Sequence, residues 1–319
     1  MNAHPFLVVG ESLADIVRTR DGGRTAQAGG SLMNVAFGVA RLGHPVCLVT
    51  ELGQDAYAEL IRTHLQSADV EVQAHLVAKT ASATATLDLA GAADYEFEIA
   101  WTIPPIEVPA GTHHVHAGSI AAYLAPGADT VEGILSAARD RATVSFDPNI
   151  RPLLVQDRRD ALRRTERLVR LSDVVKASDE DLRWLYPGRD LVEVAHDWLN
   201  RGPAVVTVTS GGEGAFAISR AGVVRAKAAR VDVADTVGAG DSFMAAMLDA
   251  LDSRRLLGAE RRLELDAIQL ETLAAVTERA ILAAAITVSR RGANPPSAAE
   301  LAGMDNPTGR PALTVPQVT

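Results

Sequence analysis

The segment at residues 234–248, ADTVGAGDSFMAAML, places three small residues and one acid in front of an apolar run. Gly238, Ala239 and Gly240 precede Asp241, and the run after them has the composition of a helix. The first backbone N–H groups of a helix have no partner within it, and the helix dipole is positive at that end. Because glycine lets the backbone approach a ligand closely, this turn could bind a phosphate group.

The carboxylate of Asp241 has a specific use beside such a turn. As a general base it could take the proton from a hydroxyl while the N–H groups stabilise the charge on a phosphoryl group in transfer. The same residues could instead form a tight turn in which Asp241 is an ordinary helix cap. The tetrapeptide by itself leaves both interpretations open.

The composition excludes several classes of protein. The 319 residues carry a net charge of −9, which argues against nucleic acid as a main partner. The single cysteine, Cys47, excludes an internal disulfide. No apolar run approaches the about 20 residues of a membrane span, and no signal segment is recognisable at the start. We therefore expect a cytoplasmic protein with no membrane partner.

Short apolar segments alternate with amphipathic ones along most of the chain. Nearly continuous apolar content, typical of strands buried on both faces, occurs at 5–10, 44–52, 112–118, 142–148, 172–178 and 203–212. Helical spacing of apolar residues occurs at 31–43, 127–141, 159–172, 190–202, 240–251 and 265–290. This alternation predicts an α/β fold, with a mostly parallel sheet and helices on both of its faces.

Two segments interrupt this alternation. Residues 11–30 are polar and rich in glycine, and residues 81–101 alternate apolar and polar side chains around a glycine-containing turn. The second pattern is typical of a hairpin with one exposed face, and such strands predict a small β lid over the site. The predicted organisation is an α/β core (1–10, 31–80 and 111–303), a β lid (11–30 and 81–110) and a loose tail (304–319).

These motifs together resemble the ribokinase (PfkB) family of carbohydrate kinases, along about residues 5–302. The segment DTVGAGDSF (235–243) is similar to the C-terminal signature of that family, and AGGSLMNVAFGVARLG (28–43) is similar to its N-terminal signature. The resemblance implies a ribokinase-like fold and phosphorylation of a sugar by ATP and Mg²⁺, with Asp241 as the base. The implied anion hole consists of Gly238, Ala239 and Gly240.

The implied sugar site lies near the start of the chain. Gly29, Gly30 and Asn34 match the sugar-binding turn of the family, and an amide beside close backbone suits a polyol because both donate and accept hydrogen bonds. Asp15, in GESLADIV, matches the acid that holds sugar hydroxyls in this family. A helix-entry turn and an ordinary loop acid are the alternative interpretations.

Two further motifs are implied to contact the nucleotide. SFDPNIRP (145–152) resembles fructokinases and 2-keto-3-deoxygluconate kinases, so the Arg151 guanidinium could contact the γ-phosphate or the substrate rather than form a surface ion pair. TVTSGGEGAFAI (207–218) is a strand, glycine turn and strand that lies along the nucleotide in this family, although a plain hairpin turn is the alternative. The nucleotide-binding residues implied are Lys176, Ser178, Thr209, Gly211, Gly212 and Gly214.

The chain departs from the family at one motif tied to Mg²⁺ and phosphate placement. Where the family usually has Asn-x-x-Glu, VKASDEDLRWL has Ser178 and Asp181. Asp181 still offers oxygen to a hydrated Mg²⁺, and Ser178 can still form a hydrogen bond with phosphate. Asp235 and Val237 match positions where many members hold a monovalent cation, so K⁺ is a second candidate ion. Asp235 could equally be a buried, hydrogen-bonded acid.

The predicted function is that of an ATP-dependent sugar kinase that acts on a primary hydroxyl of a neutral sugar. D-Fructose is the preferred candidate for this sugar. Residues 81–110 contain no Lys, Arg or His to bind a second anion. Their acids are Asp88, Asp94, Glu96, Glu98 and Glu107. A 2-keto-3-deoxygluconate kinase is the second choice, because Arg151 could bind its carboxylate. A non-catalytic sugar-binding regulator and a nucleoside kinase are further alternatives, and a homodimer remains open.

Overall fold

The larger of two β-sheets forms the centre of the molecule. The structure, a computed structural model, describes residues 6–18, 23–87, 93–155 and 157–304. Across the sheet the strands are β13 (Gly222–Ala226), β12 (Ala215–Ser219), β11 (Val205–Thr209), β10 (Val174–Ser178), β9 (Thr143–Asp147), β8 (His114–Gly118), β1 (Phe6–Val9), β4 (Val46–Leu52) and β5 (Glu71–Leu76). All neighbours pair in parallel except β11–β12 and β12–β13. The chain extends the sheet in both directions from β1, and such a reversal opens a crevice at the carboxyl ends of the strands.

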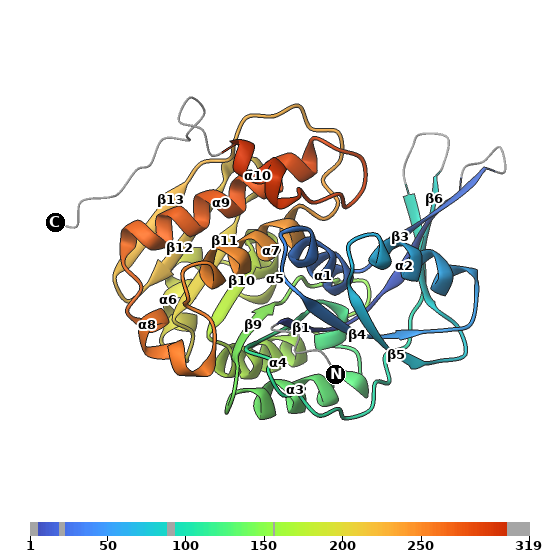
Figure 1. The fold of residues 1–319 in the computed structure, drawn as a ribbon, viewed down its shortest axis with the longest axis horizontal. Helices are drawn as coiled ribbons and strands as arrows, with labels where there is room; N and C mark the ends of the chain where they lie inside the picture. Colours follow the sequence, from blue (N-terminus) through green and yellow to red (C-terminus); the bar gives the residue numbers. More distant parts are fainter. Residues whose placement is uncertain (1–5, 19–22, 88–92, 156, 305–319) are drawn as a thin grey trace.

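Helices cover both faces of this sheet (Figure 1). One face packs against α1 (Ser31–Arg41), α2 (Ala56–Gln66), α7 (Ala239–Asp252) and α9 (Leu270–Val288). The other packs against α3 (Gly127–Ala138), α4 (Arg158–Leu171), α5 (Asp179–Leu185) and α6 (Leu191–Leu199). Strand side chains alternate between faces, so Phe6 and Val8 enter one core while Leu7 and Val9 enter the other. The predicted α/β fold with a mostly parallel sheet is confirmed.

The second sheet stands beside the first (Figure 1) and has four strands. Its order is β3 (Arg24–Gly29), β2 (Leu13–Arg18), β6 (Ala81–Leu87) and β7 (Ala93–Glu98). β6 and β7 are antiparallel, as the alternating pattern of residues 81–101 predicts. β2 and β3 form a second antiparallel pair, and β2 joins the two pairs by running parallel to β6.

Some elements differ from the sequence-based expectation. The helix expected at 265–290 is two helices, α8 (Arg262–Asp266) and α9, and Ile268 is buried in the core between them. The remaining short elements are η1 (Ile120–Ala122), η2 (Gly211–Glu213), η3 (Ala259–Arg261) and α10 (Ala298–Met304). Apart from Met304, the expected tail lies outside the described residues. Among the described helices, none has the length and apolar character needed to cross a membrane.

Candidate active site

Asp241 lies in the first turn of α7, and its side chain is 6% exposed. The helix begins after Gly238, whose φ of +77° lies in the left-handed region. A Cβ atom at Gly238 would also lie 2.6 Å from the Cβ of Ala293. Both the conformation and the available space therefore require glycine where the predicted phosphate-binding turn begins.

Both carboxylate oxygens of Asp241 accept hydrogen bonds from α1. The Ser31 hydroxyl donates to Oδ1 at 2.6 Å, and the Asn34 amide donates to Oδ2 at 2.8 Å. Residues three apart share one face of a helix, which is why both reach the same carboxylate. The Asn34 Oδ1 atom is buried and has no hydrogen-bond partner among the described residues, so it can accept from a ligand hydroxyl. The two signature motifs thus meet at Asp241.

Asp15 and the glycines of the predicted sugar turn are also close together. Burial raises the pKa of Asp15 to about 6, Arg151 opposes this shift, and Asp241 adds to it. A Cβ atom at Gly29 would collide with Oδ2 of Asp15, and Gly30 has a φ of +113°. Glycine at position 29 therefore keeps the backbone close to the Asp15 carboxylate, and glycine at position 30 suits the positive φ and the close backbone of Glu11.

A cleft of about 710 Å³ borders the first turn of α7 at Ala239 and Gly240. Its lining includes the predicted residues Arg151, Lys176, Ser178, Asp181, Thr209, Gly211, Gly212, Gly214, Ala239 and Gly240. Its apolar walls include Trp184, Val231, Phe243, Ile281 and Val288, which no sequence motif marks as site residues. Apolar walls with a few convergent polar groups are typical of a small-molecule site. Asp15, Gly29, Gly30, Asn34, Asp235, Val237, Gly238 and Asp241 lie outside its lining.

Lys176 forms a buried ion pair with Asp147 in the wall of this cleft. Its Nζ lies 2.8 Å from Oδ2 of Asp147. Burial opposes the charge on Lys176, but the ion pair with Asp147, together with the charges of Asp181 and Asp241, outweighs it, so the Lys176 pKa is raised. A Cβ atom at Gly240 would lie 2.8 Å from the same Nζ. A charged ammonium group is therefore held directly beside the glycine turn.

Ser178 and Asp181 face the cleft, but their polar atoms also cap α5. The Ser178 hydroxyl donates to Oδ2 of Asp181 at 2.7 Å and accepts from the Asp181 amide at 3.0 Å. The Ile150 amide donates to Oδ1 of Asp181 at 2.7 Å. This capping box keeps Asp181 in place and leaves it little capacity for direct metal ligation. The described residues include no group of three or more His, Cys, Asp or Glu that could hold a metal ion.

Asp235 joins two turns near the start of α7. Its Oδ1 accepts from the Val237 amide at 3.1 Å, and its Oδ2 accepts from the Gly292 amide at 2.9 Å. These backbone hydrogen bonds lower the pKa of Asp235. The Val237 side chain is 50% exposed. The monovalent-cation site at these residues stays a prediction.

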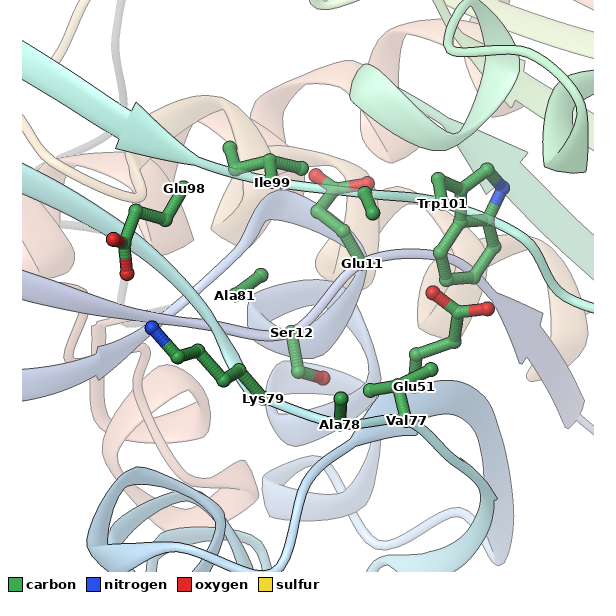
Figure 2. Close-up of a pocket in the computed structure, with 11 residues that line it drawn as sticks. Glu11, Ser12, Glu51, Val77, Ala78, Lys79, Ala81, Glu98, Ile99 and Trp101 are labelled. Atoms are coloured by element: carbon green, nitrogen blue, oxygen red, sulfur yellow. The ribbon is translucent and has the colours of Figure 1, made fainter.

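A second cavity, of about 410 Å³, lies where the four-stranded sheet joins the core (Figure 2). Its charged lining residues are Glu11, Glu51, Glu98 and Lys79. Three carboxyl groups and one ammonium group thus line this cavity, with Lys79 on the side of Glu98 (Figure 2). Burial raises the pKa of Glu11 to about 7, so this carboxyl titrates near neutral pH.

Three residues of the site were within motifs read from the sequence but were not identified. Ser31 lies in the N-terminal signature, and Asp147 and Asn149 lie in SFDPNIRP beside Arg151. The Asn149 amide donates to the Ser31 hydroxyl at 2.8 Å, and Nη1 of Arg151 donates to Oδ1 of Asn149 at 2.6 Å. The sequence signal for a site role was that each is a polar residue inside a motif that contains glycine or proline.

The glycine turn of α7 and the hydrogen bonds from α1 thus converge on the buried carboxylate of Asp241. A sequence profile of the pfkB family carbohydrate kinases matches residues 6–300, and the chain belongs to this family. The chain is therefore a carbohydrate kinase by family, as the sequence motifs predict.

The chain is similar to several fructokinases. It is 32% identical over 273 residues to the fructokinase of Rhizobium leguminosarum bv. trifolii, covering 82% of this chain and 84% of that protein. The fructokinase of Escherichia coli is 29% identical over 273 residues, covering 80% and 87%. A solved structure of Xylella fastidiosa fructokinase with bound ATP has a TM-score of 0.82 at 25% identity, covering 94% of this chain and 98% of that one. These similarities confirm the ribokinase-like fold.

Proposed function

We propose that this protein transfers the γ-phosphoryl group of ATP to a primary hydroxyl of a neutral sugar, with D-fructose as the best substrate. The observation that carries the proposal is the position of Asp241, which contacts Asn34 of the sugar turn while its neighbour Gly240 lines the large cleft. A base at this point can reach a hydroxyl on one side and a phosphoryl group on the other. The similarity to proteins named fructokinase supports the choice of sugar.

ATP is proposed to occupy the 710 Å³ cleft, and the similar Xylella fastidiosa fructokinase was solved with bound ATP. The apolar walls suit the adenine, and Thr209 with Gly211, Gly212 and Gly214 would lie along the nucleotide. The phosphates would lie against the N–H groups of the Gly238–Gly240 turn, with Lys176 and Arg151 adding positive charge.

Mg²⁺ would enter with ATP and neutralise part of the phosphate charge. The absence of a three-ligand group among the described residues fits an ion held mainly by phosphates and water. Asp181 would orient such water through the spare capacity of Oδ1, and Ser178 would lie beside the phosphates. A K⁺ ion is proposed at Asp235 and Val237, where it would support the anion hole.

The sugar is proposed to lie between the four-stranded sheet, acting as a lid, and the core. Asp15, Asn34 and the backbone at Gly29 and Gly30 would bind its hydroxyls, because carboxylate, amide and peptide groups all pair with a polyol. Asp241 would accept the proton of the reacting hydroxyl as its oxygen bonds to the γ-phosphorus, and the bond from the γ-phosphorus to the bridging oxygen breaks to release ADP. The lid, residues 11–30 and 81–110, would exclude water from this reaction.

The charges around the proposed sugar site favour a neutral substrate. Asp15 is partly buried there, and the adjoining cavity has three carboxyl groups and one ammonium group (Figure 2). A sugar acid or sugar phosphate would need a cation for its second anionic group, and Arg151 is already proposed to contact the γ-phosphate. We propose that the enzyme is cytoplasmic. We also propose that it forms a homodimer through β3 or β7, the two edge strands of the four-stranded sheet, because an edge strand can pair with a strand of a second copy.

An ADP-release assay against sugars, sugar acids, sugar phosphates and nucleosides tests this proposal. We expect kcat/KM for fructose to exceed that for 2-keto-3-deoxygluconate and for fructose phosphates by at least about tenfold, or about 1.4 kcal/mol. The Asp241→Asn variant, purified in parallel, controls for contaminating kinases. A preference for an anionic sugar would overturn the choice of substrate. If no acceptor releases ADP, the protein is a non-catalytic binder.

A further inference from the structure

Ser31 lies between Asp241 and Asn149 and forms hydrogen bonds with both. Its hydroxyl donates to Oδ1 of Asp241 at 2.6 Å and accepts from Nδ2 of Asn149 at 2.8 Å. The side chain is buried. A serine hydroxyl has one proton, and an amide nitrogen can only donate, so the serine proton is directed at the carboxylate.

Arg151 fixes the orientation of the Asn149 amide. Nη1 of Arg151 donates to Oδ1 of Asn149 at 2.6 Å, so the amide oxygen faces the guanidinium and the amide nitrogen faces Ser31. The opposite orientation would place the amide nitrogen against the guanidinium, with two donors facing each other. Each of these groups therefore donates to the next, from Arg151 through Asn149 and Ser31 to Asp241.

Asp241 is held at both oxygens, because Asn34 donates to Oδ2 while Ser31 donates to Oδ1. Two donors on different oxygens fix the rotation of the carboxylate about its Cβ–Cγ bond. Each carboxylate oxygen can accept about two hydrogen bonds, so a sugar hydroxyl can still donate to either one. The arrangement orients the base without blocking it.

We propose that Ser31 is a positioning residue for Asp241 and that Asn149 links it to Arg151. Binding of a phosphate by Arg151 would then be transmitted to the base through three hydrogen bonds, Arg151–Asn149, Asn149–Ser31 and Ser31–Asp241. This inference rests on the proposed role of Asp241 as general base. It assigns the positioning of Asp241 to Ser31 and Asn149, whereas Asn34 both contacts Asp241 and is proposed to bind the sugar.

The main chain at Ser31 has its own anchor, which makes a side-chain test practicable. The Ser31 amide donates to Oε1 of Glu11 at 3.2 Å, and the Ala121 amide donates to Oε2 of Glu11 at 3.2 Å. Ser31→Ala keeps both of these bonds. We therefore expect that variant to fold and to melt within a few degrees of the wild type.

The test is a double-mutant cycle with Ser31→Ala and Asn149→Gly. Glycine suits position 149 because Asn149 has a φ of +37°. We expect each single variant to lower kcat about tenfold and to change KM for sugar and ATP by less than about twofold. The double variant should lose no more than about the larger single loss, because both changes break one chain of bonds. Ser31→Thr, which keeps the hydroxyl, should stay within about threefold of wild-type kcat.

Ser172→Ala is the matched control. It also removes a buried hydroxyl, one that donates to the Leu168 carbonyl at 2.7 Å at the end of α4. It should leave kcat unchanged. Wild-type kcat in Ser31→Ala, or losses that multiply to about 100-fold in the double variant, would overturn the inference. A wild-type protein without sugar-dependent ADP release would instead refute the proposed function itself.

Discussion

Lys176 and Asp147 form an ion pair of 2.8 Å beside the glycine turn that precedes Asp241. Both side chains are buried, at 4% and 2% exposure. Asp147 ends β9, and Lys176 lies on the neighbouring strand β10, so the sheet itself holds the ammonium group next to Gly240. The pair thus connects the stability of the core with the charge of the proposed phosphate site.

Lys176→Met should lower the stability of the core and also weaken the binding of ATP phosphates. Burial already raises the pKa of Asp147 to about 6, so without Lys176 the carboxyl must either stay charged without a partner or take up a proton. Breaking a buried pair in this way typically costs about 3–5 kcal/mol. We expect a clear drop in melting temperature and at least about a tenfold fall in kcat/KM for ATP.

Adding Asp147→Asn separates the two effects of Lys176→Met. The double variant has no uncompensated buried charge, so its melting temperature should largely recover, while its use of ATP should stay impaired. Recovery of both would show that Lys176 serves the fold alone. Thermal melting and kcat/KM for ATP, measured on the same preparations, decide between these results.

Gly240→Ala tests the anion hole more cleanly than a change at Gly238. A side chain at Gly238 would be strained by its positive φ and would collide with Ala293, so folding would suffer along with turnover. At Gly240 an added Cβ would lie 2.8 Å from Nζ of Lys176, so the ammonium group would have to shift within its ion pair with Asp147, while alanine favours the helix. We expect Gly240→Ala to fold with a melting temperature somewhat below the wild type and to lose at least about tenfold in kcat/KM for ATP.

Gly133→Ala in α3 is the control, because a Cβ atom there meets nothing within 4 Å. It should keep wild-type kinetics with a similar gain in helix propensity. Equal kinetics in the two alanine variants would contradict the close approach of a ligand to Gly240.

His44 should make stability depend on pH at the far end of α7. It contacts Asp249 Oδ1 at 2.8 Å and Asp252 Oδ2 at 3.3 Å. Burial opposes its charge, but hydrogen bonds with these aspartates outweigh that effect and raise the His44 pKa to about 9. The folded state therefore favours charged His44, and this contribution is complete below the ordinary pKa of about 6.5 and is lost as the pH rises toward 9.

His44→Gln should therefore destabilise the protein most at about pH 6. The site is partly exposed to solvent, so we expect a loss of about 1–2 kcal/mol rather than the full effect of the pKa shift. The loss should shrink by pH 9, with kcat unchanged because His44 lies at the opposite end of α7 from Asp241. Denaturant unfolding of both proteins at pH 6, 7.5 and 9 measures this loss in the free energy of unfolding. A loss that does not vary with pH would refute a charged His44.

The sequence predicted the fold well where local patterns carry the signal. All four residues of β1 are buried, and such continuous apolar runs identify strands covered on both faces. β5 was missed because an edge strand with the sequence EVQAHL is polar and largely exposed. The break between α8 and α9 was missed because no Gly or Pro marks residues 267–269.

The site was predicted less completely, because its contacts join distant parts of the chain. Asp241 and its glycine turn are local and could be identified from one motif. Ser31 is 210 residues from Asp241, and Asn149 is 118 residues from Ser31, so only the folded chain reveals these bonds. The capping box of Ser178 and Asp181 is a local S-x-x-D pattern, but the resemblance directed attention to metal and phosphate instead.

The most direct test of the account is the turnover of Asp241→Asn with ATP and D-fructose. The amide has the same shape as the carboxylate but cannot take a proton, so kcat should fall by roughly 10²–10⁴ while KM for both substrates changes little. Thermal melting should confirm that the variant is folded. Turnover near the wild-type rate in a folded Asp241→Asn protein would contradict the account, because Asp241 would then be only the first-turn acid of α7.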